Sequence, residues 1–170
     1  MRKILTLIIV ISALSMLQAV SARAEDGLRA RVARIAARLE PVTGLKSAVI
    51  VADDQNKNAW VRPDRTIILT SGLISACASD DEIAFIIAHE ASHVISKDYM
   101  HSVPAFTNSP EVPAIQMKEI SADINGVFFV KKAGYNPDAS IKILSRLAPS
   151  NNNFVRRLDM LTNFLKSLKN

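Results

Sequence analysis

Two histidines and a glutamate stand within five residues of one another in the middle of the sequence: His89, Glu90 and His93 form the pattern H-E-x-x-H. On an α-helix, a spacing of four residues places both imidazoles on one face, one turn apart, where they can bind a single Zn²⁺ ion. Glu90 lies about 100° further round the helix, from where it can reach a metal-bound water molecule without being a ligand. The pattern therefore predicts metal-assisted hydrolysis, with Glu90 removing a proton from the attacking water.

A third ligand for such an ion is available in an acidic pair, Glu119 and Asp123, which are also four residues apart. Glu119 is the predicted third protein ligand of one zinc ion per chain, which leaves a fourth position for water. Asp123 is one turn further on, where it can accept a hydrogen bond from a ligand histidine and fix its tautomer. The apolar residues around the pair indicate a buried helix. The alternative is that these histidines and acidic residues bind no metal.

The predicted elements around these residues place them on two helices. A capping-box pattern that begins at Ser79 opens the helix of the H-E-x-x-H motif. Residues 98–110 contain prolines and are expected to form a loop, in which His101 is interpreted as a surface histidine. The second helix is expected over about 112–133, where Gly126 indicates that another backbone passes close by.

The rest of the chain predicts a small sheet followed by helices. Three short apolar segments joined by tight turns indicate a small, largely antiparallel sheet. The further predicted elements are a helix over 26–40, strands over 45–51, 59–61 and 66–70, and helices over 72–78, 136–147 and 153–168. We therefore expect an α+β fold with a single domain over 25–170. Cys77 is the single cysteine, which excludes an internal disulfide, and its apolar surroundings indicate a buried side chain rather than a nucleophile.

The first 24 residues have the features of a signal peptide. Arg2 and Lys3 precede a largely apolar run over 4–17, and Ala22-Arg23-Ala24 offers a cleavage site. We therefore expect a periplasmic or secreted protein, with membrane contact allowed but no membrane span in the mature chain; a retained membrane anchor is the alternative. The same segment holds three cations and no acid, so the formal net charge of +5 gives no argument for a nucleic-acid partner.

Several sequence blocks, taken in order, resemble one family of metallopeptidases. They are Asp81-Glu82-Ile83-Ala84, His89-Glu90-Ala91-Ser92-His93, Glu119-Ile120-Ser121-Ala122-Asp123 and Ala133-Gly134-Tyr135-Asn136-Pro137, preceded by Asn58-Ala59-Trp60 and Thr70-Ser71-Gly72-Leu73. Together they are similar to the HtpX-like, Oma-type and CAAX-prenyl-protease family of gluzincin zinc metallopeptidases, over residues 45–147. The resemblance implies a zincin-like fold and the same roles for the motif residues, Glu119 and Asp123.

The resemblance also implies a substrate and the place where it binds. The block Asn58-Ala59-Trp60 resembles the edge strand on which peptide substrates lie in that family, and it would bind an extended peptide by strand addition. A place in the ordinary core is the alternative for Trp60. The implied activity is that of a zinc-dependent endopeptidase of the bacterial cell envelope, acting on unfolded or misassembled proteins.

Two departures from the family pattern bear on activity. The segment between His93 and Glu119 lacks the hydrophobic hairpin of membrane-embedded members, which implies a soluble, minimal relative. Residues 151–157 read Asn-Asn-Asn-Phe-Val-Arg-Arg, without the histidine that often precedes an arginine in the family. The resemblance assigns Arg157 to that arginine, as a transition-state stabiliser, and loss of the histidine would lower the rate. The alternative function is a metal-binding but weakly active or inactive protein that works as a chaperone or adaptor, and the oligomeric state has no signal in the sequence.

Overall fold

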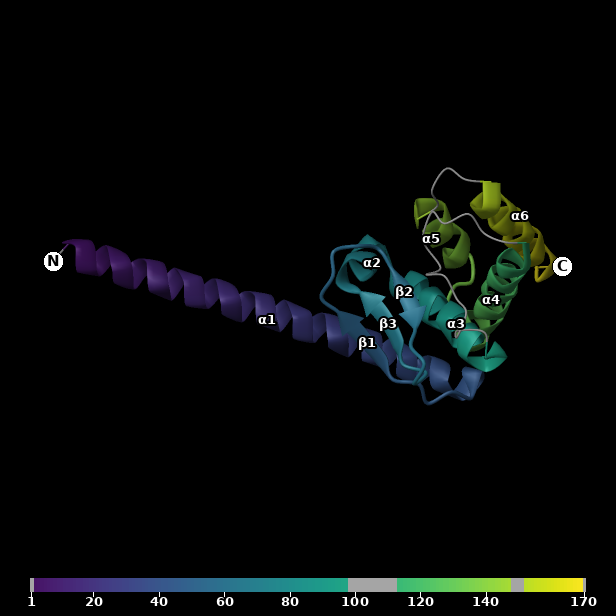
Figure 1. Cartoon of the computed structure of the whole chain (residues 1–170), viewed down its shortest axis with the longest axis horizontal. Coiled ribbons are helices and arrows are strands. Elements are labelled where there is room, and N and C mark those ends of the chain that lie inside the picture. The colour runs from purple at the N-terminus through teal and green to yellow at the C-terminus, as the bar shows by residue number, and fades with distance from the viewer. Residues whose placement is uncertain (1, 98–112, 148–151, 170) are drawn as a thin grey trace.

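The computed structural model describes residues 2–97, 113–147 and 152–169 (Figure 1). The helices are α1 (Arg2–Thr43), α2 (Ser71–Ala76), α3 (Asp80–Ser96), α4 (Pro113–Lys132), α5 (Ala139–Leu147) and α6 (Asn152–Ser167), and the strands are β1 (Val49–Ala52), β2 (Ala59–Val61) and β3 (Ile67–Thr70). This arrangement confirms the expected α+β class. The predicted loop over 98–110, with His101, falls outside the described residues.

One continuous helix, α1, covers both the predicted signal segment and the predicted helix over 26–40. Its first half projects away from the rest of the molecule, and its second half packs beside the sheet (Figure 1). Val32, Ile35 and Leu39 are buried on the apolar stripe that the sequence predicted. The helix is longer than expected because the residues ahead of 26 include neither proline nor glycine to stop it. Among the described residues, no helix combines the length and the apolar character needed to cross a membrane.

The sheet is mixed, with the strand order β1-β3-β2. β3 pairs with β1 in parallel and with β2 in antiparallel orientation. The sequence predicted a largely antiparallel sheet, but only one of the two pairings is antiparallel, because β3 inserts between the two strands that precede it in the chain. All four residues of β3 are buried, including Ile67, Ile68 and Leu69, and a strand of this kind is stable only where both its faces are covered. β2 is thereby left as an edge strand.

The helix α3 packs against α1, α4, α5 and the sheet. Its N-terminus is capped by Ser79, whose hydroxyl accepts a hydrogen bond from the backbone N–H of Glu82. The Glu82 carboxylate accepts a hydrogen bond from the N–H of Ala78, one residue before the position that a capping box uses. The same carboxylate binds the guanidinium of Arg146 on α5, with Nη2 3.0 Å from Oε1. These contacts fix the start of α3 to α5.

The helix α4 is held from two sides. It approaches α3 closely at Gly126, where a Cβ atom would lie 3.2 Å from Cε2 of Phe85 and 3.3 Å from the backbone nitrogen of His89. The close-passing backbone predicted from this glycine is therefore confirmed. At the far end of α4, the Nε of Arg38 on α1 donates a hydrogen bond of 2.7 Å to the carbonyl of Ala133. The position of α4, and of the acidic pair that it carries, thus depends on both α1 and α3.

One further prediction is confirmed in the outer part of the fold, and the prediction for Cys77 is confirmed in part. Phe154 and Leu161 of α6 are buried on its predicted apolar stripe, which packs against α4 and α5. Cys77 follows α2 and is partly buried, with its Sγ 3.4 Å from the carbonyl oxygen of Leu73. Burial raises the pKa of the Cys77 thiol to about 12, which agrees with a structural side chain rather than a nucleophile.

Candidate metal centre

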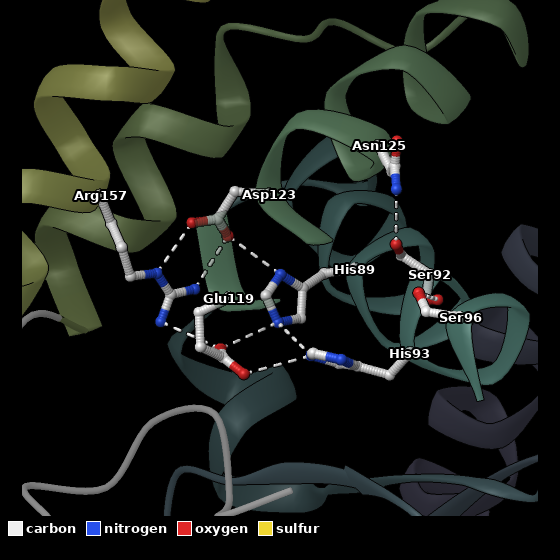
Figure 2. A network of polar contacts seen from close by, with 8 residues as sticks. All are labelled: His89, Ser92, His93, Ser96, Glu119, Asp123, Asn125 and Arg157. Atoms are coloured by element: carbon white, nitrogen blue, oxygen red, sulfur yellow. Dashed lines mark hydrogen bonds and ion pairs between the residues drawn. The ribbon is translucent and has the colours of Figure 1, made fainter. Parts of the chain in front are cut away.

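The structure brings the three predicted ligands together between α3 and α4 (Figure 2). The Nε2 atoms of His89 and His93 are 3.3 Å apart. Oε2 of Glu119 lies 3.4 Å from Nε2 of His89, and Oε1 lies 3.3 Å from Nε2 of His93. All three side chains are buried. Residues from two helices therefore point their ligand atoms at one shared place.

One ligand atom from each of the three residues lies within 4.8 Å of the other two. With Zn–N and Zn–O bonds of about 2.0–2.1 Å, neighbouring ligand atoms of a tetrahedron are about 3.3–3.4 Å apart, and the two imidazole nitrogens match this spacing. Two imidazole nitrogens and one carboxylate oxygen are also a donor set that zinc accepts in sites with an open fourth position. The three residues thus fit the ion in chemistry, and their ligand atoms are gathered closely enough to share it. In zinc enzymes of this kind, the fourth position takes water or substrate.

The pKa values in the cluster reflect closely opposed charges. Burial by itself lowers the pKa of His89, but hydrogen bonds with Asp123 and Glu119 outweigh burial and raise it to about 10. Burial likewise lowers the pKa of His93, but the hydrogen bond with Glu119 and the charges of Glu90 and Glu119 together outweigh it and raise the pKa. Burial raises the pKa of Glu119, yet the two imidazoles hold it well below its usual range. Because zinc binds neutral imidazoles, zinc uptake must displace protons from this cluster.

Glu90 lies on α3 next to the first histidine of the motif and is buried. Burial raises its pKa, and the charges of His89 and His93 offset only part of that effect. Its Oε1 is buried without a hydrogen-bond partner in the described part of the chain. The ligand group formed by the described residues does not include Glu90. A buried carboxylate with a raised pKa and an unused acceptor atom is suited to accept a proton and release it again.

Asp123 supports one of the histidines, in the arrangement that its spacing predicted. It lies one helical turn after Glu119 on α4, and its Oδ1 is 2.9 Å from Nδ1 of His89. A proton on Nδ1 that is donated to Asp123 leaves Nε2 of the same ring as an acceptor that faces the ligand position. Burial raises the pKa of Asp123, but the Arg157 guanidinium and His89 hold it below its usual range. The carboxylate therefore stays ionised inside the protein.

Arg157 reaches the same cluster from α6. Its Nε and Nη2 each lie 2.8 Å from an oxygen of Asp123, and its Nη1 lies 3.3 Å from Oε2 of Glu119 (Figure 2). The side chain is buried, with its guanidinium 5.1 Å from the centre of the Phe154 ring. The resemblance placed Arg157 at the site, and the structure does bring it there. The atoms that its guanidinium faces are carboxylate oxygens of the protein.

The sequence pattern of one peptidase family, Peptidase family M48, matches residues 8–110, which is more than half of the chain. The chain belongs to peptidase family M48. The resemblance inferred from the sequence blocks is thereby confirmed. The M48 match includes His89, Glu90 and His93 but ends before Glu119, so the helices α4, α5 and α6 lie outside it.

Curated relatives of this M48 chain include three proteins named mitochondrial metalloendopeptidase OMA1. The protein of Saccharomyces cerevisiae is 25% identical over 134 residues, which cover 62% of this chain and 38% of the relative. The protein of Arabidopsis thaliana is 24% identical over 127 residues, which cover 61% of this chain and 26% of the relative. The protein of Schizosaccharomyces pombe is 23% identical over 145 residues, which cover 68% of this chain and 43% of the relative. The chain thus spans less than half of the length of these relatives.

The predicted substrate strand of the M48 domain is β2, the edge strand that packs against α3. Ala59 is buried and Trp60 is half-buried. Asn58 directly precedes the strand, and its backbone N–H and C=O pair with the hydroxyl and the N–H of Thr70. The Asn58 side-chain oxygen is buried without a hydrogen-bond partner among the described residues. The edge position agrees with the predicted role, and Trp60 is not enclosed in the core.

Sequence reasoning missed a second link between α3 and α4 near the M48 motif. Nδ2 of Asn125 donates a hydrogen bond of 2.9 Å to Oγ of Ser92 (Figure 2). Ser96 donates in turn to the carbonyl of Ser92 at 2.6 Å. Ser92 occupies one of the two unspecified positions of the H-E-x-x-H pattern. The available signal was a serine and an asparagine near the predicted metal-binding faces, but nothing local identified the two as partners.

Proposed function

We propose that this chain is a zinc-dependent endopeptidase. The observation that carries the proposal is the convergence of the ligand atoms of His89, His93 and Glu119 within 4.8 Å of one another, next to the buried carboxylate of Glu90, in a domain of family M48. The name of the relatives, metalloendopeptidase, supports a peptide or protein as the substrate. One zinc ion per chain would be held by the three ligand residues.

The residues of the chain would divide the work of hydrolysis among them. When bound, zinc acidifies water and polarises the carbonyl of the peptide bond. Glu90 would accept a proton from the attacking water at a carboxylate oxygen and pass it to the leaving amine. Asp123 keeps the proton of His89 on Nδ1, so that Nε2 stays available as a ligand. The outer edge of β2, with Asn58, would pair with the extended backbone of the substrate.

We also propose that the enzyme is exported and acts in the bacterial cell envelope, in the quality control of unfolded or misassembled proteins. The support for export is the basic start, the apolar run and the Ala22-Arg23-Ala24 site in the first 24 residues. In this proposal residues 1–24 are a signal peptide, and α1 would begin near residue 25 in the mature protein. N-terminal sequencing of the protein recovered from a periplasmic fraction tests both statements, and an intact Met1 in that fraction would contradict cleavage.

A second candidate function is a metal-binding chaperone or adaptor with weak or no peptidase activity. The observation that favours it is the absence of histidine over 151–157, where the family often has one. Such a protein would keep the fold and the metal but hydrolyse peptides slowly, because one donor to the transition state is missing.

Zinc content tests the proposed metal site. Wild type is expected to hold one zinc ion per chain, and Glu119→Ala is expected to lose most of it, because the remaining two histidines do not complete the site. Elemental analysis of both proteins, purified side by side, gives the comparison. Wild-type protein that neither contains zinc nor takes it up would rule out the enzyme and leave the fold as a scaffold for binding.

The variant Glu90→Gln separates the enzyme from the chaperone or adaptor. It keeps the shape of the side chain but cannot accept the proton, so cleavage of an unfolded protein such as casein should fall by about 10²–10⁴-fold. Zinc content should stay at the wild-type level, because Glu90 is not one of the ligands. Equal cleavage by wild type and Glu90→Gln would contradict the proposed role of Glu90.

A further inference from the structure

We propose that Arg157 is a positioning residue of the zinc site, so that the C-terminal helix α6 takes part in building the site. The inference rests on the zinc-binding function proposed above and goes beyond it. Arg157 lies outside the family match over 8–110, and the resemblance assigned it a transition-state role. The geometry of its guanidinium points to a different role.

The guanidinium reaches two carboxylates of the site at once (Figure 2). Nε and Nη2 form a bidentate pair with Asp123, both at 2.8 Å, which fixes the plane of that carboxylate. Oδ1 of Asp123 in turn lies 2.9 Å from Nδ1 of His89. Nη1 of Arg157 lies 3.3 Å from Oε2 of Glu119, the oxygen that faces His89. Arg157 therefore orients one proposed ligand directly and a second one through Asp123.

The charges around the site explain why a cation is needed there. Glu119 and Asp123 are buried carboxylates one helical turn apart on α4, one as a proposed ligand and the other as the support of a ligand. Two buried carboxylates at this spacing repel each other. The guanidinium lies against both carboxylates and offsets that repulsion. This effect is local to the metal site.

The direction of the donors separates this role from transition-state stabilisation. A stabiliser of the transition state must aim a donor at the oxyanion of the substrate. Nε and Nη2 donate to Asp123, and Nη1 lies 3.3 Å from Oε2 of Glu119. These contacts assign Arg157 the support of Asp123 and Glu119.

The test compares zinc affinity among variants of the full chain, measured by competition with a chromophoric zinc chelator. Arg157→Met should bind zinc about 10- to 100-fold more weakly than wild type, the loss typical of a removed support of a metal ligand. The matched control is Arg146→Met, because Arg146 also pairs with a buried carboxylate, Glu82, but at the start of α3. The control should keep wild-type zinc affinity. Wild-type affinity in Arg157→Met, together with reduced kcat, would overturn the inference in favour of the transition-state role.

Two more variants exclude a merely structural effect. In the double variant Arg157→Met/Asp123→Asn, the loss of zinc affinity should be smaller than the product of the two single losses, because Arg157 acts largely through Asp123. Fully multiplicative losses would overturn that part of the inference. Arg157→Lys keeps a cation without the bidentate geometry, and it remains testable if Arg157→Met fails to fold. Its affinity should lie below that of wild type, and a wild-type value would overturn the inference.

The outcomes also separate the inference from the function on which it rests. If wild type binds no zinc, both fail. If wild type binds zinc and loses it in Glu119→Ala, but the Arg157 variants bind as tightly as wild type, the inference alone fails.

Discussion

Two arginines from the C-terminal helices bind buried carboxylates on the central helices, but in different surroundings. Arg146 on α5 binds Glu82 at the start of α3, and Arg157 on α6 binds Asp123 in the middle of α4. The Arg146 side chain is 38% exposed, whereas the Arg157 side chain is 0% exposed. Both pairs use the same chemistry and both join neighbouring helices. The difference lies in what each carboxylate does besides binding its arginine.

The comparison shows that an arginine–carboxylate pair can stabilise helix packing in one place and support a metal site in another. Glu82 also accepts the N–H of Ala78, so that the first pair completes the start of a helix. Asp123 also holds His89, so that the second pair extends into the metal site. A fully buried ion pair is seldom more stabilising than apolar packing of the same volume. The presence of the second pair is therefore better explained by the site than by stability.

The largest effect on the free energy of unfolding is expected from Asp123→Ala. The change leaves the buried Arg157 without its bidentate partner, and an uncompensated buried charge destabilises a fold by about 3–5 kcal/mol. The measurement is urea unfolding followed by circular dichroism. The corresponding change at the other pair, Glu82→Ala, should cost less, because the exposed Arg146 can turn to water. A larger loss for Glu82→Ala would contradict the distinction between the two pairs.

A smaller effect is expected where α3 and α4 touch between the two pairs. Gly126→Ala would place a Cβ atom 3.2 Å from Phe85 and 3.3 Å from the backbone of His89. Overpacking of this kind typically costs about 1–3 kcal/mol, and it should also weaken zinc binding, because Glu119 and Asp123 move with α4. Thermal unfolding and chelator competition measure the two effects. Gly27→Ala on α1, where a Cβ meets nothing within 4 Å, is the matched control.

Arg146→Met should lower the free energy of unfolding by about 0.5–1.5 kcal/mol, because its two hydrogen bonds to Glu82 come from a side chain that is partly exposed to water. Glu82 would keep the N–H of Ala78 as a partner. Peptidase activity per folded molecule should not change. A loss of activity at full zinc loading would show that the start of α3 communicates with the site, and the two pairs would then no longer be distinct.

The smallest effect is expected on the free energy of unfolding at acidic pH. Burial raises the pKa of Glu82, but Arg146 and the N–H of Ala78 outweigh it and hold the folded-state pKa below the ordinary 4.5. A depressed pKa contributes stability that is present above the unfolded-state value and is lost as pH falls through the folded-state value. The free energy of unfolding should therefore decrease below about pH 4.5, and Glu82→Gln should flatten that decrease. Urea titrations at pH 6 and below pH 4.5 measure the difference. An unchanged slope in Glu82→Gln would assign the acid sensitivity to other carboxylates.

The parts of the site that the sequence predicted are those encoded by short spacing. His89 and His93, and then Glu119 and Asp123, are each four residues apart on one helix, so helical geometry alone places each pair on one face. Their convergence across two helices was inferred from chemistry, since two histidines need a third ligand. The contact of Arg157 with both carboxylates could not be predicted, because it depends on how α6 packs against α4. The parallel pairing of β1 with β3 was missed for the same reason, as strand order is a property of the whole fold.

The origin of the proposed ligands in two separate helices has a consequence for the folding of the exported enzyme proposed above. An ion held by α3 and α4 acts as a cross-link, and at free zinc about 100-fold above its dissociation constant it adds about 2.7 kcal/mol to the stability of the folded state. Exported proteins of this size often gain such stability from disulfides, and this chain has a single cysteine. Zinc supply would then take the place of oxidative folding. Under zinc starvation the chain would lose its resistance to proteolysis along with its activity.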